Sequence, residues 1–215
     1  MRRTLMFLLV ALAVSGTAVA ADDISKVNGT ASVDAGGKAG EVHTVNGSVK
    51  IGDRAVVEKA GTVNGSVDMG AAATADSVKT VNGAVTLHRD ARVNEDVETV
   101  NGRLALEPGA DVKGHLSNVN GEMELDHAHV GGGIETVNAD VTLTASRVEG
   151  GLTVKKPRMN WHSNDDRRPK IVIGPHSVVQ GTMTFERPVD LYVSSSATVG
   201  KIEGATPKSF SGDAP

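Results

Sequence analysis

The sequence predicts an all-β protein folded as a three-sided parallel β-helix with about 18 residues per coil. Two observations predict this fold. The triplet Val-Asn-Gly returns at almost fixed intervals, and aromatic residues make up only 2% of the chain. Self-similarity at a short fixed period is typical of a solenoid, whose units stack only on their neighbours. A thick core uses large rings to fill its volume, so a chain with very few rings predicts a thin core.

The asparagines of the repeated triplet are separated by steps of 18 or 19 residues; they are Asn28, Asn46, Asn64, Asn82, Asn101, Asn120 and Asn138. Glycine follows the first six and Ala139 follows the seventh. Asparagine and glycine suit a sharp bend, because asparagine hydrogen-bonds nearby backbone and glycine accepts a positive φ. We therefore expect each triplet to form a corner, with its valine pointing inward and its asparagine in a structural ladder. A glycan or ligand track is the alternative function for this column.

Within a unit, apolar residues recur at every sixth position, and three such segments make one coil; the series begins Val45, Ile51, Val57, Val63, Met69. Many of these residues have an apolar partner two positions earlier, as in Val49-Lys50-Ile51, which is the period of a β-strand. The spacing does not determine the handedness of the coil. The preference for right-handed parallel crossovers favours a right-handed coil, and a left-handed coil is the alternative, because six-residue repeats with turns like IGPHSV also occur in left-handed ones. The residues before the triplet valines predict a second polar column: Thr44, Thr62, Thr80, Thr99, Asn118 and Thr136.

Residues 1–20 are typical of a secretory signal peptide. Two arginines precede an apolar run from Leu5 to Val14, and Ala18-Val19-Ala20 forms a small-residue cleavage site. The run is shorter than the roughly 20 residues that span a bilayer, so we expect cleavage after Ala20, with a retained anchor as the alternative. The mature chain then has 20 basic and 26 acidic side chains, a net charge of −6, and is expected to be periplasmic or secreted.

Composition excludes several classes of function. A net negative charge does not suit a nucleic-acid partner. The absence of cysteine excludes disulfides, a lipid-modified cysteine and thiolate metal sites. No Gly-x-Ser-x-Gly elbow or phosphate-binding loop is present. We therefore predict no catalytic residues and no cofactor.

The predicted β-helix domain covers residues 21–204 and is interrupted by an excursion at 155–170. Insertions into solenoids often lie on a functional face. The candidate contacts to a partner are Trp161, Arg158, Arg167 and Arg168. A solvated loop whose tryptophan covers the coil edge is the alternative. Residues 205–215 are expected to be a flexible C-terminal tail.

Alignment of the coils places His88, Glu107 and Asp126 in one column. Side chains about 5 Å apart in such a column are within reach of one divalent cation. Closed zinc sites use tighter ligand sets, however, and carboxylates beside a histidine also form ordinary surface networks, so we predict no metal. The same alignment pairs opposite charges in two other columns: Arg103 with Glu122, and Lys50 with Asp68.

The segment IGPHSVVQG, residues 173–181, resembles the hexapeptide motif of trimeric acyltransferases. That resemblance makes His176 a candidate catalytic base. Those enzymes work where acyl-coenzyme A or acyl carrier protein is present, and this chain carries an export signal. We therefore favour a structural histidine in a turn.

Two segments resemble the bactofilins, which are polymer-forming bacterial cytoskeletal proteins: LALEPGADVKGHLSNVNGEMELDHAHVGGGIETV and IVIGPHSVVQGTM. The resemblance is one of pattern, covers roughly residues 24–204, and implies a right-handed triangular β-helix that polymerises. The TVNGSV units are also similar to those of putative β-solenoid adhesins. The export signal and the excursion depart from the bactofilin pattern, so the cytoplasmic role of that family is not carried over.

These observations favour a non-catalytic structural or scaffold protein of the bacterial cell envelope that self-associates through its coil ends, because uncovered strand edges tend to pair. A cell-wall or other envelope component is a further expected partner. A monomeric, adhesin-like binding module is the alternative function, and a hexapeptide-type acyltransferase is a third.

Overall fold

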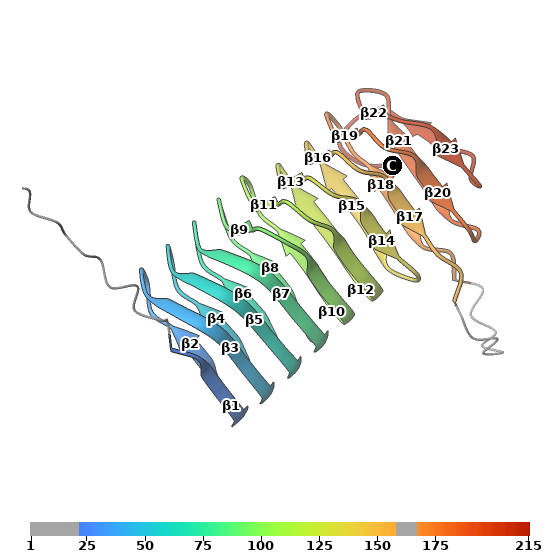
Figure 1. Cartoon of the computed structure of the whole chain (residues 1–215). Coiled ribbons are helices and arrows are strands. Elements are labelled where there is room, and N and C mark those ends of the chain that lie inside the picture. Colours follow the sequence, from blue (N-terminus) through green and yellow to red (C-terminus); the bar gives the residue numbers. More distant parts are fainter. Residues whose placement is uncertain (1–21, 158–166) are drawn as a thin grey trace, which may run out of the picture.

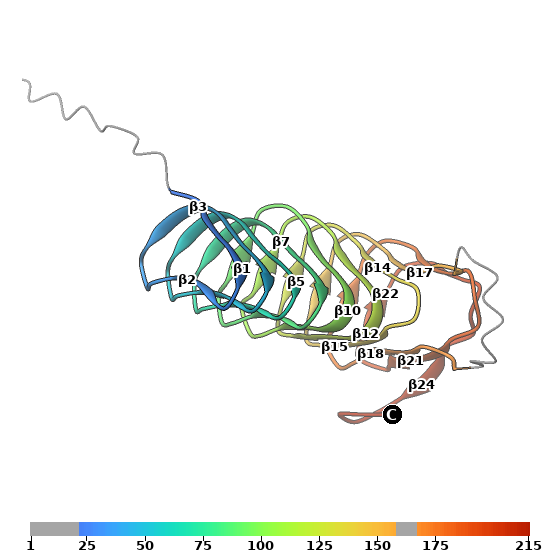
Figure 2. The same ribbon diagram turned by 90° about the horizontal axis from the view of Figure 1, so that it is seen from below.

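The computed structural model describes residues 22–157 and 167–215. In these residues the regular structure is one parallel sheet of 24 strands, wound into a solenoid of about ten turns (Figure 1). Figure 2 shows the coils following one another along the rod in chain order. This confirms the predicted parallel β-helix; the right-handed sense stays a prediction. No helix long and apolar enough to cross a membrane occurs in the described ranges. The expected signal peptide, residues 1–20, lies outside them.

The strands form three columns, which are the three faces of the rod. The first face contains β2 (Ala31–Val33), β4 (Val49–Ile51), β6 (Val67–Met69), β8 (Val85–Leu87), β15 (Asp140–Thr144), β18 (Lys170–Ile173), β21 (Asp190–Ser194) and β24 (Lys208–Phe210), together with the C-terminal halves of β10 (Val97–Leu106) and β12 (Leu116–Asp126).

The second face contains the N-terminal halves of β3 (Lys38–Asn46), β5 (Val56–Asn64) and β7 (Thr74–Asn82), then β9 (Arg92–Val93), β11 (Asp111–Val112), β13 (His129–Val130), β16 (Arg147–Val148), β19 (Val178–Val179) and β22 (Thr198–Val199). The third face contains β1 (Ile24–Asn28), the C-terminal halves of β3, β5 and β7, the N-terminal halves of β10 and β12, then β14 (Ile134–Thr136), β17 (Leu152–Val154), β20 (Met183–Phe185) and β23 (Ile202–Glu203).

The core is a narrow column of aliphatic side chains, as the shortage of aromatic residues predicts. The first face supplies the larger groups, such as Met69, Leu87 and Leu104, which are fully buried. The second face supplies alanine followed by valine, as at Ala55 and Val57. Small residues on one face leave room for large residues on another, so side chains from the three faces fill the prism together.

The valine of the repeated triplet points outward, so the predicted inward orientation is wrong. Val27, Val81 and Val100 have exposed fractions of 67%, 40% and 38%, whereas Thr80 and Thr99, which precede the last two, are buried. The reason is the alternation of side chains along a strand: the third-face residue two positions before each threonine points inward, so the threonine does too and the valine does not. In the six-residue apolar series, one position in three, that of the triplet valine, therefore points outward.

A second regular corner joins the first face to the second, and the sequence does not reveal it. Eight successive coils place one residue there with φ between 45° and 81°: Gly36, Arg54, Ala72, Asp90, Gly109, His127, Ala145 and His176. Only two of these are glycine. For a residue other than glycine, this conformation costs roughly 1–2 kcal/mol. Contacts between the stacked coils must offset that cost.

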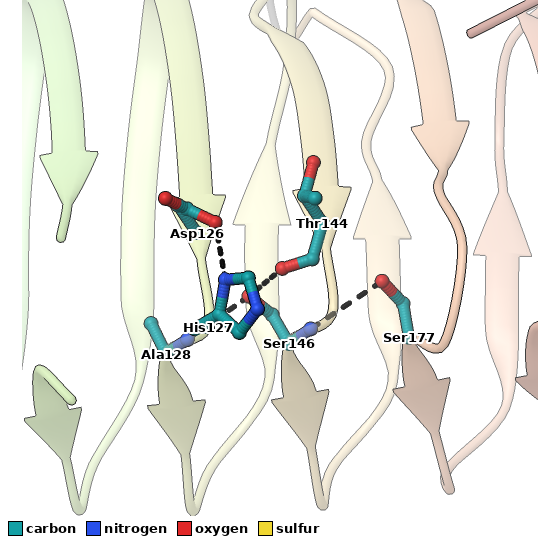
Figure 3. A network of polar contacts seen from close by, with 6 residues as sticks. All are labelled: Asp126, His127, Ala128, Thr144, Ser146 and Ser177. Atoms are coloured by element: carbon teal, nitrogen blue, oxygen red, sulfur yellow. Dashed lines mark hydrogen bonds and ion pairs between the residues drawn. The ribbon is translucent and has the colours of Figure 1, made fainter. Parts of the chain in front are cut away.

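Two of these corners, those of Ala128 and Ser146, use side-chain hydroxyls in place of the usual backbone hydrogen bond of the turn (Figure 3). At Ala55, Ala73 and Ala91 the amide donates to the carbonyl three residues earlier. At Ala128 the amide instead donates to Oγ of Ser146, at 3.1 Å, and this hydroxyl donates to the carbonyl of Thr144. The amide of Ser146 in turn reaches Oγ of Ser177, at 3.4 Å. Buried serines in the alanine column therefore replace missing turn bonds.

The C-terminal segment corrects one predicted boundary. Residues 205–215 were expected to form a flexible tail after a β-helix ending at residue 204. Strand β24 (Lys208–Phe210) pairs with β21 in parallel, with Tyr192 opposite Lys208 and Ser194 opposite Phe210. Lys208 and Lys170 lie over the ring of Tyr192 from the two neighbouring strands. The sheet therefore extends to Phe210 on the first face.

Substitution of Ser146 by alanine tests the role of the buried hydroxyls. Ser146→Ala removes the acceptor for the Ala128 amide and leaves that amide buried, so we expect the free energy of unfolding to fall by about 1–3 kcal/mol. Ser117→Ala is the control, because Ser117 points outward and its hydroxyl makes no hydrogen bond within the described ranges. Urea denaturation should separate the two variants; equal stabilities would contradict the assignment.

Candidate functional site: the asparagine ladder and the coil ends

The seven triplet asparagines lie in one line along the rod, which confirms the predicted ladder. In each pair, Nδ2 of the later asparagine donates to Oδ1 of the asparagine in the preceding coil, at 2.8 to 3.2 Å. An interior member such as Asn64 therefore donates one bond and accepts another. All the amides point the same way, so bonds in the chain can polarise and strengthen one another.

The column before the valines satisfies the backbone of the corner. Oγ1 of Thr44, Thr62 and Thr80 donates to the carbonyl oxygen of the triplet glycine in the preceding coil, at 2.9 to 3.1 Å. Asn118 does the same through Nδ2, at 3.0 Å. Its Oδ1 is the one buried side-chain polar atom in the described ranges that has no partner. A threonine hydroxyl suits this position because it leaves no such atom.

The triplet glycines are required because the corner backbones of successive coils touch. A Cβ placed on Gly65 would lie 1.9 Å from the carbonyl oxygen of Gly47, and a Cβ on Gly102 would lie 2.0 Å from that of Gly83. Gly29 belongs to the first triplet and has nothing within 4 Å of such an atom. Steric exclusion by the coil beneath therefore explains the interior glycines better than turn conformation alone.

The ladder ends differently at its two ends. At the C-terminal side, the Arg187 guanidinium donates to Oδ1 of Asn138 and to the carbonyl of Val137, and its other terminal nitrogen reaches the carbonyl of Arg167 at 3.1 Å. At the N-terminal side, Asn28 accepts from Asn46, but its own Nδ2 has no acceptor among residues 22–157 and 167–215. Arg187 therefore closes the ladder at its C-terminal end, and the N-terminal end, at Asn28, is open.

Part of the predicted partner loop is held against the rod. Asp140 accepts a bond from Arg167 Nη2 at 2.5 Å and another from the amide of Lys170 at 2.8 Å, where the chain returns to the first face. Arg168 lies near Arg187 at a shallow surface hollow. Trp161 and Arg158, the other predicted contacts, lie outside the described residues.

The predicted metal column is only partly brought together. His88 Nδ1 lies 2.9 Å from Glu107 Oε1, as the alignment predicts, but Nε2 lies 3.0 Å from Asp68 Oδ1. Asp126 instead contacts His127. In the described ranges, no group of three or more histidine and acidic side chains is arranged to hold a metal ion. Both ring nitrogens of His88 are engaged, so the arrangement is a surface network across three coils.

Carboxylates on both sides affect the titration of His88. Partial burial lowers its pKa, but the hydrogen bonds and charges of Glu107 and Asp68 outweigh burial, and the pKa lies above its ordinary value of 6.5.

The contacts of His129 have a similar geometry to those of His88: Nδ1 lies 2.6 Å from Asp111 Oδ1, and Nε2 lies 3.4 Å from Glu149 Oε1. Two histidines thus each bridge acidic side chains of the coils before and after them.

Two predicted charge pairs have different partners. Arg103 lies opposite Glu122 in register but pairs with Glu124. Lys50 lies opposite Asp68 in register, whereas the ion pair of Asp68 is with His88. Long side chains reach diagonal neighbours on the adjacent strand, so register alone does not determine which charges meet.

A shallow groove on the third face was not predicted. Gly61 stands at an outward position where the neighbouring coils carry His43 and Lys79, so the surface is hollowed there. Lys59 and Glu41 are also among the lining residues. The signal in the sequence is a glycine where the adjacent coils have long side chains. Charges of both signs line the groove and specify no single ligand.

His176, the candidate residue of the acyltransferase reading, is exposed at the left-handed corner, with φ of 58°. Its amide contacts Oγ of Ser196 at 3.3 Å. The turn position expected for this histidine is therefore confirmed.

Comparisons with known proteins identify no relative. No protein family matches the chain, and neither a curated protein nor a solved structure is significantly similar to it. The bactofilin and adhesin likenesses therefore rest on the sequence pattern, and the structure supports the β-helix fold that they share.

The steric role of the triplet glycines can be tested with a matched pair of variants. Gly65→Ala forces a Cβ against the backbone of the coil beneath, so we expect a loss of about 3 kcal/mol or more of unfolding free energy. Gly29→Ala makes the same change where no coil lies beneath; with φ of 92° at Gly29, it should cost only about 1–2 kcal/mol. Thermal or urea denaturation measures both, and equal losses would contradict the proposed steric role.

The His88 network predicts a pH-dependent contribution to stability. Because the folded pKa is raised, the contribution is complete below the unfolded value of 6.5 and is lost as the pH rises through the folded pKa. His88→Gln should therefore destabilise the protein more at about pH 5.5 than at about pH 8.5. The difference should be only a few tenths of a kcal/mol, because the side chains are exposed and screened.

His43→Gln is the matched control, since His43 also faces outward but forms no ion pair in the described ranges. Denaturation of both variants across this pH range checks the prediction. A His88→Gln effect that is independent of pH, or larger at alkaline pH, would contradict it.

Proposed function

We propose that this chain is a non-catalytic structural or scaffold protein of the bacterial cell envelope that assembles through its coil ends. The observation that carries the proposal is the continuity of the sheet, which runs through the coils on all three faces. At one end, β1 and β2 are paired on one side only within the described residues, and at the other end the same holds for β22, β23 and β24. Uncovered strand edges pair with other edges.

The distribution of residue types supports a structural role. The repeated asparagines, threonines and glycines each have a partner or a steric role within the rod. Location in the envelope rests on the predicted signal peptide, residues 1–20. The bactofilin-like pattern supports assembly into polymers, but the export signal argues against the cytoplasmic role of that family.

One contact at the N-terminal end favours the alternative function, a monomeric adhesin-like module. In the second and third coils, the carbonyls of Ser48 and Ser66 accept bonds from Ala31 and Val49 of the coil beneath. The equivalent carbonyl in the first coil is that of Thr30, and Nζ of Lys26 donates to it at 2.5 Å. A lysine at a strand edge is a common protection against edge pairing. Lys26 therefore weakens, or regulates, association through this end.

Sedimentation velocity and negative-stain microscopy of the mature chain test the proposal. We expect oligomers or filaments whose size grows with protein concentration. Lys26→Thr should strengthen association through the N-terminal end, because it frees the Thr30 carbonyl. Lys59→Thr is the control, since Lys59 is exposed on an interior coil. If the parent chain and Lys26→Thr both remain monomeric at high concentration, assembly is refuted and the monomeric module is favoured.

A further inference from the structure

The Asn-Gly pairs of the ladder carry a chemistry that the fold must control. The glycine amide nitrogen can attack Cγ of the preceding asparagine. The N–Cγ bond forms, the Cγ–Nδ2 bond breaks, and Nδ2 leaves as ammonia with the proton lost by the glycine amide. Water then opens the cyclic imide to aspartate or isoaspartate. Glycine has no Cβ to hinder this attack, and asparagine is among the chemically labile residues. Six ladder positions have this pair.

In the stacked coils the attacking nitrogen is engaged. The amides of Gly29, Gly47, Gly65 and Gly83 each donate to the backbone carbonyl of the ladder asparagine in the next coil, at 2.9 to 3.0 Å. An amide must give up this bond before its nitrogen turns toward Cγ. The bond between coils therefore slows the first step at each of these pairs.

The carboxamide that would be attacked is also held at interior positions. Asn46, Asn64, Asn82 and Asn101 each donate through Nδ2 and accept through Oδ1. Rotation of such a group toward its own glycine breaks two ladder bonds. An attack requires close and aligned approach of the reacting atoms, which the ladder opposes.

Asn28 is held less firmly than these interior members. It accepts a bond from Asn46, but Nδ2 has no acceptor in the described ranges. It lies on β1, the terminal strand of the third face, next to Val27, whose exposed fraction is 67%. The space around Gly29 is open, with no heavy atom within 4 Å of a Cβ placed there. Rotation of this carboxamide breaks one ladder bond.

We propose that Asn28 is a site of spontaneous deamidation and that the stack protects the interior Asn-Gly pairs from the same reaction. An aspartate at position 28 still accepts the bond from Asn46, so the ladder tolerates the product. An aspartate at position 64 has no amide to donate to Asn46, and the ladder would be interrupted. The reaction adds one negative charge to the open end of the rod. The isoaspartate product also lengthens the backbone of β1.

Peptide mapping by mass spectrometry tests this assignment. The exported chain is incubated in dilute solution at mildly alkaline pH, with and without denaturing urea. In the folded protein, Asn28 should convert about tenfold faster than Asn64 or Asn82, the factor expected for one additional hydrogen bond. In urea the three sites should convert at similar rates. Equal rates in the folded protein, or an Asn28 as inert as the interior sites, would overturn the proposal.

A gap in the ladder provides the second test. Asn46→Ala removes the acceptor for Nδ2 of Asn64, so conversion of Asn64 should rise by about tenfold while Asn101, further along, keeps its rate. Val45→Ala changes the same corner and leaves the ladder complete, and it should accelerate neither site. Circular dichroism confirms that both variants are folded. A folded Asn46→Ala variant with an unchanged Asn64 rate would show that the ladder does not protect.

Discussion

Contact between the backbones of successive coils is the constraint on which the rest of this structure depends. At the Val-Asn-Gly corner the coils approach so closely that a Cβ on Gly65 would overlap the carbonyl of Gly47. This approach stacks each asparagine on its counterpart. It also places the hydroxyls of Thr44, Thr62 and Thr80 within reach of the glycine carbonyl in the preceding coil. Identical residues in register satisfy each other's polar groups. The corner sequence therefore repeats, since each coil needs the same residues as the coil beneath it.

The period of about 18 residues predicted the fold because each stacked coil meets the same backbone contact at its corner and therefore needs the same residue types there. The ladder and the alternating first-face strands, such as Val49–Ile51, were recognisable for the same reason. The orientation of the triplet valine was not, since threonine and valine both suit a strand and only the geometry of the corner decides which points inward. The left-handed corner was hidden because residues such as Arg54 and Ala72 adopt that conformation without glycine. At this corner, the packing of successive coils outweighs the conformational preference of the individual residue.

Side-chain partners were less predictable than backbone register. His88 meets Glu107, as the alignment indicates, but its second partner, Asp68, lies diagonally in the preceding coil. Arg187 reaches Asn138 from a distant part of the chain, so no local pattern marks it. Residues 205–215 were expected to be a flexible tail, yet β24 within this segment pairs with the edge of β21.

At the two ends of the rod, contacts of individual residues replace the contacts that repeat from coil to coil. Arg187 closes the ladder at one end, and Lys26 covers a carbonyl at the other. An interior coil is constrained by two neighbours and a terminal coil by one, so functional differences between rods of this kind should concentrate at their ends. For this chain, the proposed assembly and the proposed deamidation of Asn28 both take place at the ends.

Side-chain amide NMR tests the stacked ladder most directly. If the asparagines lie as described, nuclear Overhauser effects should connect the Hδ2 protons of Asn46 with those of Asn64, and those of Asn64 with those of Asn82, and these protons should exchange slowly with water. Rapid exchange, with no contacts between amides one coil apart, would contradict the stacked architecture.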